Sequence, residues 1–72
     1  MTKEPEVEYT VRDRLLRAWE NSMELVRDFE TYSKRIDDEG ISKVFKEFAE
    51  DEGMHASKFR ELLMKEEKQY KQ

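Results

Sequence analysis

Apolar residues recur along this chain at the three- and four-residue intervals of an α-helix, and they form two separate stripes. The first stripe runs from Leu15 to Ile36 without an intervening Gly or Pro, and the second runs from Ile41 to Leu63. Intervals of this kind place the apolar side chains on one face of a helix. The pattern therefore predicts an all-α fold made of two amphipathic helices.

The first predicted helix has a recognisable start. Thr10 is followed three residues later by Asp13, which resembles a capping box, and we therefore place this helix at about 11–37. Residues 1–9 precede the cap and contain the chain's one proline, Pro5, together with three glutamates. We predict that they form a flexible N-terminal arm.

A short turn separates the two stripes. The acidic run that ends in Gly40 breaks the apolar pattern, and Gly40 suits a left-handed C-cap. We therefore place the turn at 38–40 and the second helix at about 41–69. A turn this short makes the helices antiparallel neighbours, so residues 10–72 are predicted to form one helical hairpin.

The length of the chain bears on its assembly. Seventy-two residues make at most one small domain, and the absence of cysteine excludes disulfides and thiolate zinc sites. Two helices cannot bury two wide apolar faces against each other alone, whereas two hairpins can do so as a four-helix bundle. We therefore predict a homodimer, or a higher homo-oligomer, in which the hairpins form a four-helix bundle.

Charge and hydropathy exclude several classes of partner. Charged residues make up 44% of the chain, but their signs are mixed and the net charge is −4, which is a poor match to nucleic acid. No apolar run approaches the length of a membrane-spanning helix, and the first residues lack the apolar segment of a signal peptide. The expectation is a soluble cytoplasmic protein without membrane or nucleic-acid partners.

The second stripe contains a polar pair, Glu52 and His55, one helical turn apart. Glu52 follows Phe48 by four residues, and His55 precedes Phe59 by four, so both are predicted to face the core. A buried carboxylate needs a charge, a hydrogen bond or a metal. A dimer would contain two such pairs, and carboxylate with imidazole suits iron, manganese or zinc.

A second interpretation of the same pair involves no metal. Glu52 and His55 could bond to each other, or to their symmetry mates, as a buried polar network that fixes the register of the helices. The chain would then be a metal-free dimeric structural or interaction module.

Helix 1 offers few ligands to complete a metal site. The position that should face Glu52 and His55 lies near Ser22 or Val26, and neither is a carboxylate. Of the nearby glutamates, Glu24 points almost directly away and Glu20 is less averted. Glu20 is therefore the candidate third ligand from helix 1.

The segment from Val44 to Leu63 resembles the second bundle helix of the ferritin-like superfamily, specifically its rubrerythrin-related branch. An apolar pair, an alanine, Glu-x-x-His and then a phenylalanine and leucines recur there at similar spacing, and the resemblance covers roughly residues 15–64. It implies a ferritin-like four-helix bundle with a non-haem di-iron centre that handles dioxygen, peroxide or stored iron. Glu52 would be the bridging carboxylate and His55 a terminal ligand.

The same resemblance places the helix-1 ligand at Ser22, and a shift of two residues would restore Glu20. With serine at that position, a dimer would offer two glutamates and two histidines, enough for a single metal or a weak pair. The expected function is therefore that of a small ferritin-like metal-binding protein, a possible oxidoreductase or iron-handling protein. The metal-free dimeric module is the alternative.

Overall fold

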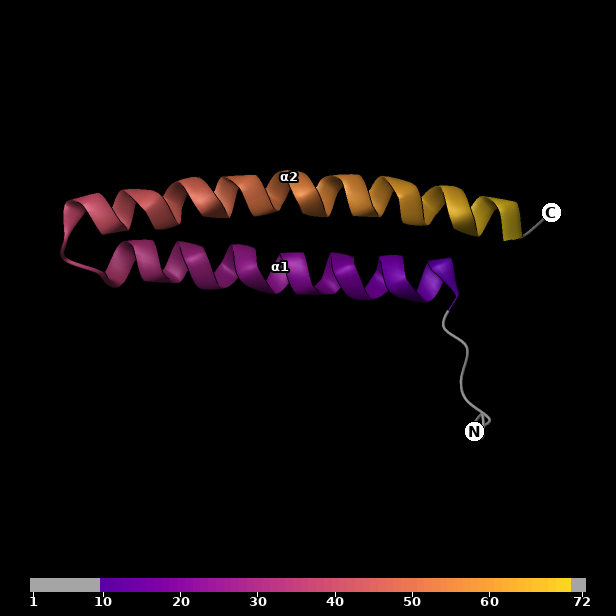
Figure 1. Ribbon diagram of the computed structural model, residues 1–72, viewed down its shortest axis with the longest axis horizontal. Helices are drawn as coiled ribbons and strands as arrows, with labels where there is room; N and C mark the ends of the chain where they lie inside the picture. The colour runs from indigo at the N-terminus through magenta and orange to yellow at the C-terminus, as the bar shows by residue number, and fades with distance from the viewer. Residues whose placement is uncertain (1–9, 71–72) are drawn as a thin grey trace, which may run out of the picture.

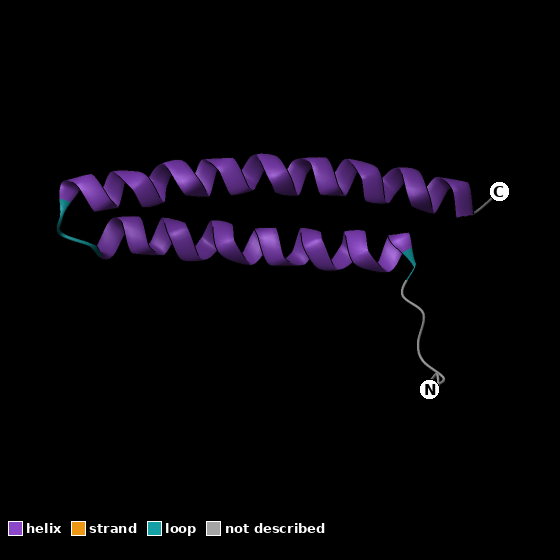
Figure 2. Ribbon diagram, viewed as in Figure 1, coloured by secondary structure: helices purple, strands orange, loops and turns teal. Residues whose placement is uncertain are grey.

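The computed structural model describes residues 10–70, and their side chains as far as residue 66. Two helices, α1 (Val11–Arg35) and α2 (Glu39–Tyr70), run antiparallel and side by side in a single layer (Figure 1). A short loop at 36–38 connects the two helices (Figure 2). The all-α hairpin predicted from the apolar stripes is confirmed. The predicted arm at 1–9 lies outside the described residues.

The capping box predicted at the start of α1 is present. The Asp13 amide donates to the Thr10 hydroxyl at 3.0 Å, and the Thr10 amide donates to the Asp13 carboxylate at 3.2 Å. These two bonds satisfy N–H groups that the first turn of a helix leaves without partners. The start of the first helix is therefore set locally, by two side chains three residues apart.

The turn differs from its prediction by about two residues at each end. Helix α1 stops at Arg35 because Ile36 adopts an extended backbone, with φ −85° and ψ 128°, and donates to the carbonyl of Tyr32. Helix α2 begins at Glu39, where the Asp38 carboxylate accepts from the Ile41 amide at 3.0 Å. The predicted left-handed C-cap at Gly40 is wrong, because Gly40 has no positive φ and lies inside α2. An N-cap by Asp38 takes its place.

Small residues fill much of the contact between the helices. The buried residues are Ser22, Ala49, Ala56 and Leu63, which are 6%, 4%, 3% and 8% exposed. Nearer the turn the rings of Phe29 and Phe45 pack with centroids 5.6 Å apart. Among the described residues, no large side chain is fully buried. The single hairpin therefore brings its helices close together without enclosing a core of its own.

Gly53 gives a testable consequence of this packing. A methyl group added at Gly53 would meet no atom within 4 Å, so nothing inside the hairpin requires a glycine there. We expect Gly53→Ala to stabilise the protein by about 0.5–1 kcal/mol, because alanine restricts the unfolded chain and favours the helix. Chemical denaturation at matched protein concentration measures this gain.

The control is Gly40→Ala, since a methyl group there would lie 3.3 Å from the Asp38 oxygen that caps α2. This second variant should gain less than Gly53→Ala. A loss of stability in Gly53→Ala would show that another chain packs closely against that position.

Candidate functional site

One broad side of the hairpin carries two rows of residues at seven-residue spacing. On antiparallel packed helices this spacing keeps side chains on the same side, next to the contact between the helices. We call these eight residues the apolar face: Val11, Ala18, Leu25 and Tyr32 on α1, and Ile41, Phe48, His55 and Leu62 on α2.

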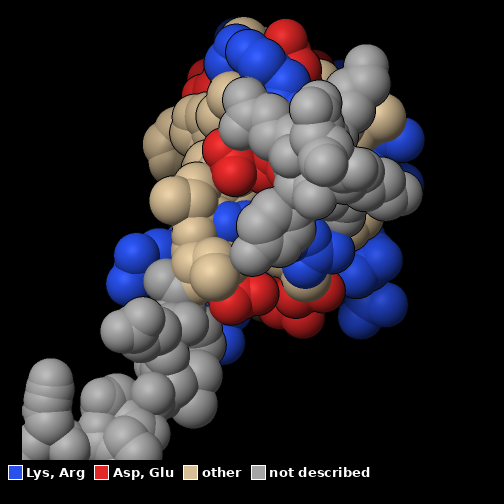
Figure 3. Space-filling model, turned by 90° about the vertical axis from the view of Figure 1, so that its right-hand side faces the viewer, with Lys and Arg blue, Asp and Glu red and all other residues tan. Residues whose placement is uncertain are grey.

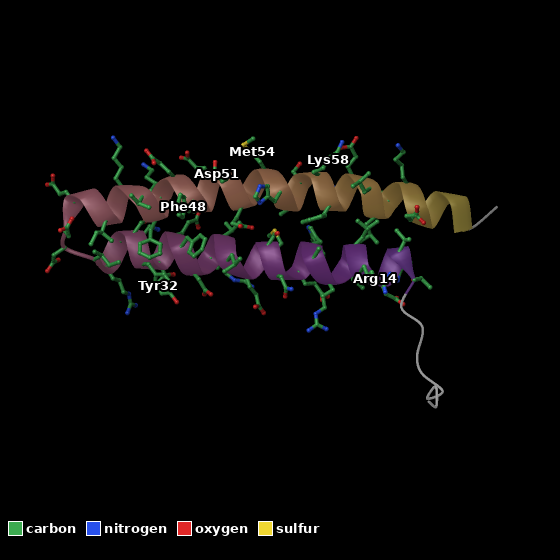
Figure 4. All side chains as sticks on the ribbon, in the orientation of Figure 1. Arg14, Tyr32, Phe48, Asp51, Met54 and Lys58 are labelled. Atoms are coloured by element: carbon green, nitrogen blue, oxygen red, sulfur yellow. The ribbon has the colours of Figure 1, made fainter. Side chains whose placement is uncertain are left out.

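Contacts at both ends of the hairpin show that the two rows lie on the same side. Near the turn, Tyr32 packs edge-on against Phe45 at 5.4 Å between centroids, and Phe48 approaches Phe29 at 6.4 Å (Figure 4). At the opposite end, Val11 and Leu62 line the same groove. The apolar face is therefore continuous along the hairpin.

The apolar face is largely open to solvent in the single chain. Phe48 and Ile41 are each 50% exposed, Val11 is 57% exposed, and Tyr32 and Leu25 are also exposed. Nine large apolar residues are exposed within the described part of the chain, and five of them belong to this face. Val44 borders it, and the other three are methionines elsewhere. Exposed apolar surface concentrated in this way is typical of interaction sites.

The opposite side of the hairpin is charged. A groove there is lined by Glu30 and Lys34 from α1 and by Lys46 and Glu50 from α2. Seen end-on, acidic and basic side chains lie next to one another at the top and bottom of the molecule (Figure 3). Alternating charge of this kind is typical of a solvated helix surface. Near the turn this side is thus more polar than the apolar face, although Met23, seven residues before Glu30, is also exposed on this side.

Glu52 and His55 lie near the middle of the apolar side. The Nδ1 atom of His55 is 3.6 Å from a carboxylate oxygen of Glu52. The Glu52 side chain is 21% exposed, whereas the His55 side chain is 62% exposed. The expectation that both face a core is met only by Glu52 within one chain. His55 stands among the open apolar residues, where a second molecule could cover it.

Ser22 lies at the same level of the hairpin as Glu52. The pair Phe29 and Phe45 fixes the alignment of the antiparallel helices, and one heptad further along brings Ser22 opposite Glu52. Ser22 is buried there. Of the two positions predicted to face the polar pair, Ser22 and Val26, Ser22 is therefore the one level with Glu52.

Glu20 occupies a different part of the surface. It is exposed, and it lines outer grooves of α1 with Glu24 and Arg27 on one side and with Asp13 on the other. Within residues 10–66, no three acidic or histidine side chains come close enough to hold a metal ion. One chain therefore supplies two candidate ligands, Glu52 and His55, and does not add Glu20 to them.

Comparison with known proteins finds no matching family model, curated protein or solved structure. The resemblance to rubrerythrin-related proteins therefore stays a prediction. No helix in the described range combines the length and apolar content that a membrane crossing requires.

Spacing at three and four residues does not predict the open apolar face. It groups Phe48, Glu52, His55 and Phe59 on one stripe, because all recur at those intervals. This stripe is wide enough to contact α1 on one side and to leave a second side open. A stricter seven-residue spacing separates His55 and Phe48, which face outward, from Ala56, which faces α1.

Proposed function

We propose that this chain is one half of a four-helix bundle. Two copies associate through their apolar faces, and the Glu52 and His55 side chains of both copies then bind one divalent transition metal inside the bundle. The observation that carries this proposal is the position of the pair: a carboxylate and an imidazole 3.6 Å apart, near the middle of an otherwise apolar open face.

The packing of the single hairpin supports the association. Its buried residues are mostly small, while large side chains such as Phe48 and Tyr32 remain half open to water. Covering a half-exposed aromatic side chain stabilises a complex by roughly 1 kcal/mol, and the face offers several such groups in each copy. A second copy supplies the same apolar surface, as a twofold interface requires.

The donor chemistry supports the metal. One chain contributes one carboxylate and one imidazole, which is too few for a stable site, and two chains contribute four donors. Oxygen and nitrogen donors of this kind suit iron, manganese or zinc. A metal would also neutralise the carboxylates that association buries. Iron at this site would add the oxygen or peroxide chemistry that the resemblance implies.

A second candidate function is a metal-free dimeric interaction module. The observation that favours it is Ser22, which is buried at the level of Glu52 and supplies no carboxylate. In this case Glu52 and His55 would serve only as a polar contact that fixes the register of the bundle. The two candidates share the dimer and differ in the metal.

Metal analysis of protein purified without chelators separates the candidates. We expect one divalent ion for every two chains, together with a dimer in sedimentation equilibrium. In His55→Leu the metal should be lost and the dimer weakened, because the Glu52 carboxylates that association buries lose both the metal and the neighbouring imidazole.

A wild-type dimer that contains no metal, and takes none up on dialysis against Mn²⁺, Fe²⁺ or Zn²⁺, would leave only the metal-free module. A wild-type protein that is monomeric at millimolar concentration would contradict both candidates.

A further inference from the structure

We propose that the second copy packs with its turn at the opposite end of the bundle, on a twofold axis perpendicular to the helices. This inference rests on the association proposed above and adds its orientation. Two twofold arrangements can bring apolar faces together. In one, the two turns lie at the same end and α1 faces α2 of the second copy. In the other, the turns lie at opposite ends and each helix faces its own counterpart.

The sizes of the residues on the apolar face favour opposite ends. Within one hairpin, Ala18 stands level with His55, and Leu25 stands level with Phe48, so the level that contains Ala18 has less side-chain volume than the level beside it. With the turns at the same end, Leu25 would meet Phe48 of the second copy at one level and Ala18 would meet His55 of the second copy at the next, so the two levels would hold unequal volumes. An evenly filled interior needs the opposite.

The opposite-end arrangement evens out these volumes. An axis between the two central levels sets Ala18 over Leu25 of the second copy, and His55 over Phe48 of the second copy. Each level then contains one small pair and one large pair. Further out, Val11 meets Tyr32 of the second copy, so every level of the face is paired.

Charges along the edges of the face favour the same arrangement. Arg14 on α1 lies at the level of Lys58 on α2, and both are exposed on the outer edges (Figure 4). Turns at the same end would therefore set Arg14 beside Lys58 of the second copy, which is repulsive. Turns at opposite ends set Arg14 beside Asp28 of the second copy instead, and Lys65 near Asp38 of the second copy.

One edge contact opposes this arrangement. The axis passes close to Asp51, so the two exposed Asp51 side chains approach each other. Two attractive contacts, each occurring twice by symmetry, stand against that single repulsion, which solvent screens. A cation bound by Glu52 and His55 near the axis would reduce it further. The balance of charge therefore agrees with the packing of large against small residues.

The distance between the two turns decides the orientation. Asp37 is exposed in the turn, and the chain has no native cysteine, so Asp37→Cys can carry a single spin label. With a rise of about 1.5 Å per residue, opposite turns place the labels roughly 45 Å apart, whereas turns at the same end place them within about 20 Å. We expect the long distance in pulsed dipolar spectroscopy of the dimer.

Cross-linking gives an independent reading with a matched control. Asn21 lies on the edge of α1 close to the proposed axis, so Asn21→Cys should form a disulfide with its own counterpart on mild oxidation. Asp28→Cys lies one heptad away on the same edge, opposite Arg14 of the second copy, and should not. Both positions are exposed, so neither substitution disturbs the helix contact.

The outcomes separate this inference from the proposed function. A dimer with a short label distance and no Asn21→Cys disulfide would overturn the orientation and leave the association standing. A protein that sediments as a monomer would overturn both.

Discussion

Phe48→Asp is expected to abolish dimer formation, raising the dissociation constant at least about a hundredfold. Phe48 is half exposed at the centre of the apolar face, and its ring lies close to Phe29. The substitution removes apolar area and places a charge in each copy where association would bury it, at a cost of several kcal/mol. Each 1.4 kcal/mol is a factor of ten in affinity, so the expected loss exceeds two such factors.

Sedimentation equilibrium and circular dichroism over a range of concentrations measure this loss. The matched control is Met54→Asp, which places the same charge on the same helix at the outer edge, where Met54 is 70% exposed (Figure 4). The control should remain dimeric and helical. Equal effects of the two substitutions would mean that Phe48 matters only as an apolar residue of α2 and that the apolar face is not the interface.

Ser22→Glu is expected to lower the stability of the metal-free protein and to raise its affinity for metal. Ser22 is 6% exposed and lies at the level of Glu52, so a glutamate there puts a second carboxylate into a confined space. Without metal, the free energy of unfolding should fall by about 3 kcal/mol or more. With metal, each chain offers three donors instead of two, and we expect affinity for Mn²⁺ or Zn²⁺ to rise at least about tenfold.

Isothermal titration with each metal, and thermal unfolding before and after its addition, test both halves of this expectation. Ser22→Gln has the same size without the charge, and it should lose stability without gaining metal affinity. Glu20→Gln should change neither quantity, because Glu20 is exposed on the outer surface of α1. A Ser22→Glu protein that metal does not restabilise would place the Glu52 and His55 pair outside any metal site.

The sequence was sufficient to predict those parts of the fold that local chemistry controls. Thr10 and Asp13 form a cap within one turn of helix, so their spacing alone was informative. The bounds of the turn were harder to predict, because Gly40 is suited to end the first helix and Asp38 is suited to begin the second. Asp38 begins α2, and Gly40 follows inside it with an ordinary backbone.

The candidate site could be located from the sequence but not oriented. Helical spacing correctly placed Glu52 and His55 on neighbouring turns, and their atoms do approach each other. Spacing at three and four residues could not tell which of them faces α1, because a wide stripe contains both a contact between the two helices and a second, open side. The 21% and 62% exposure of the two side chains decides that question.

No large side chain is fully buried in the described hairpin, and this makes the folded fraction depend on protein concentration if a second copy completes the core. When association completes the core, folding becomes a second-order process, and the folded fraction depends on how many copies are present. A tenfold dilution then removes about 1.4 kcal/mol of apparent stability. At low concentration the chain would be mostly unfolded and accessible to proteases, whereas at high concentration it would be mostly a folded dimer. The level of expression would therefore itself regulate the lifetime of the protein.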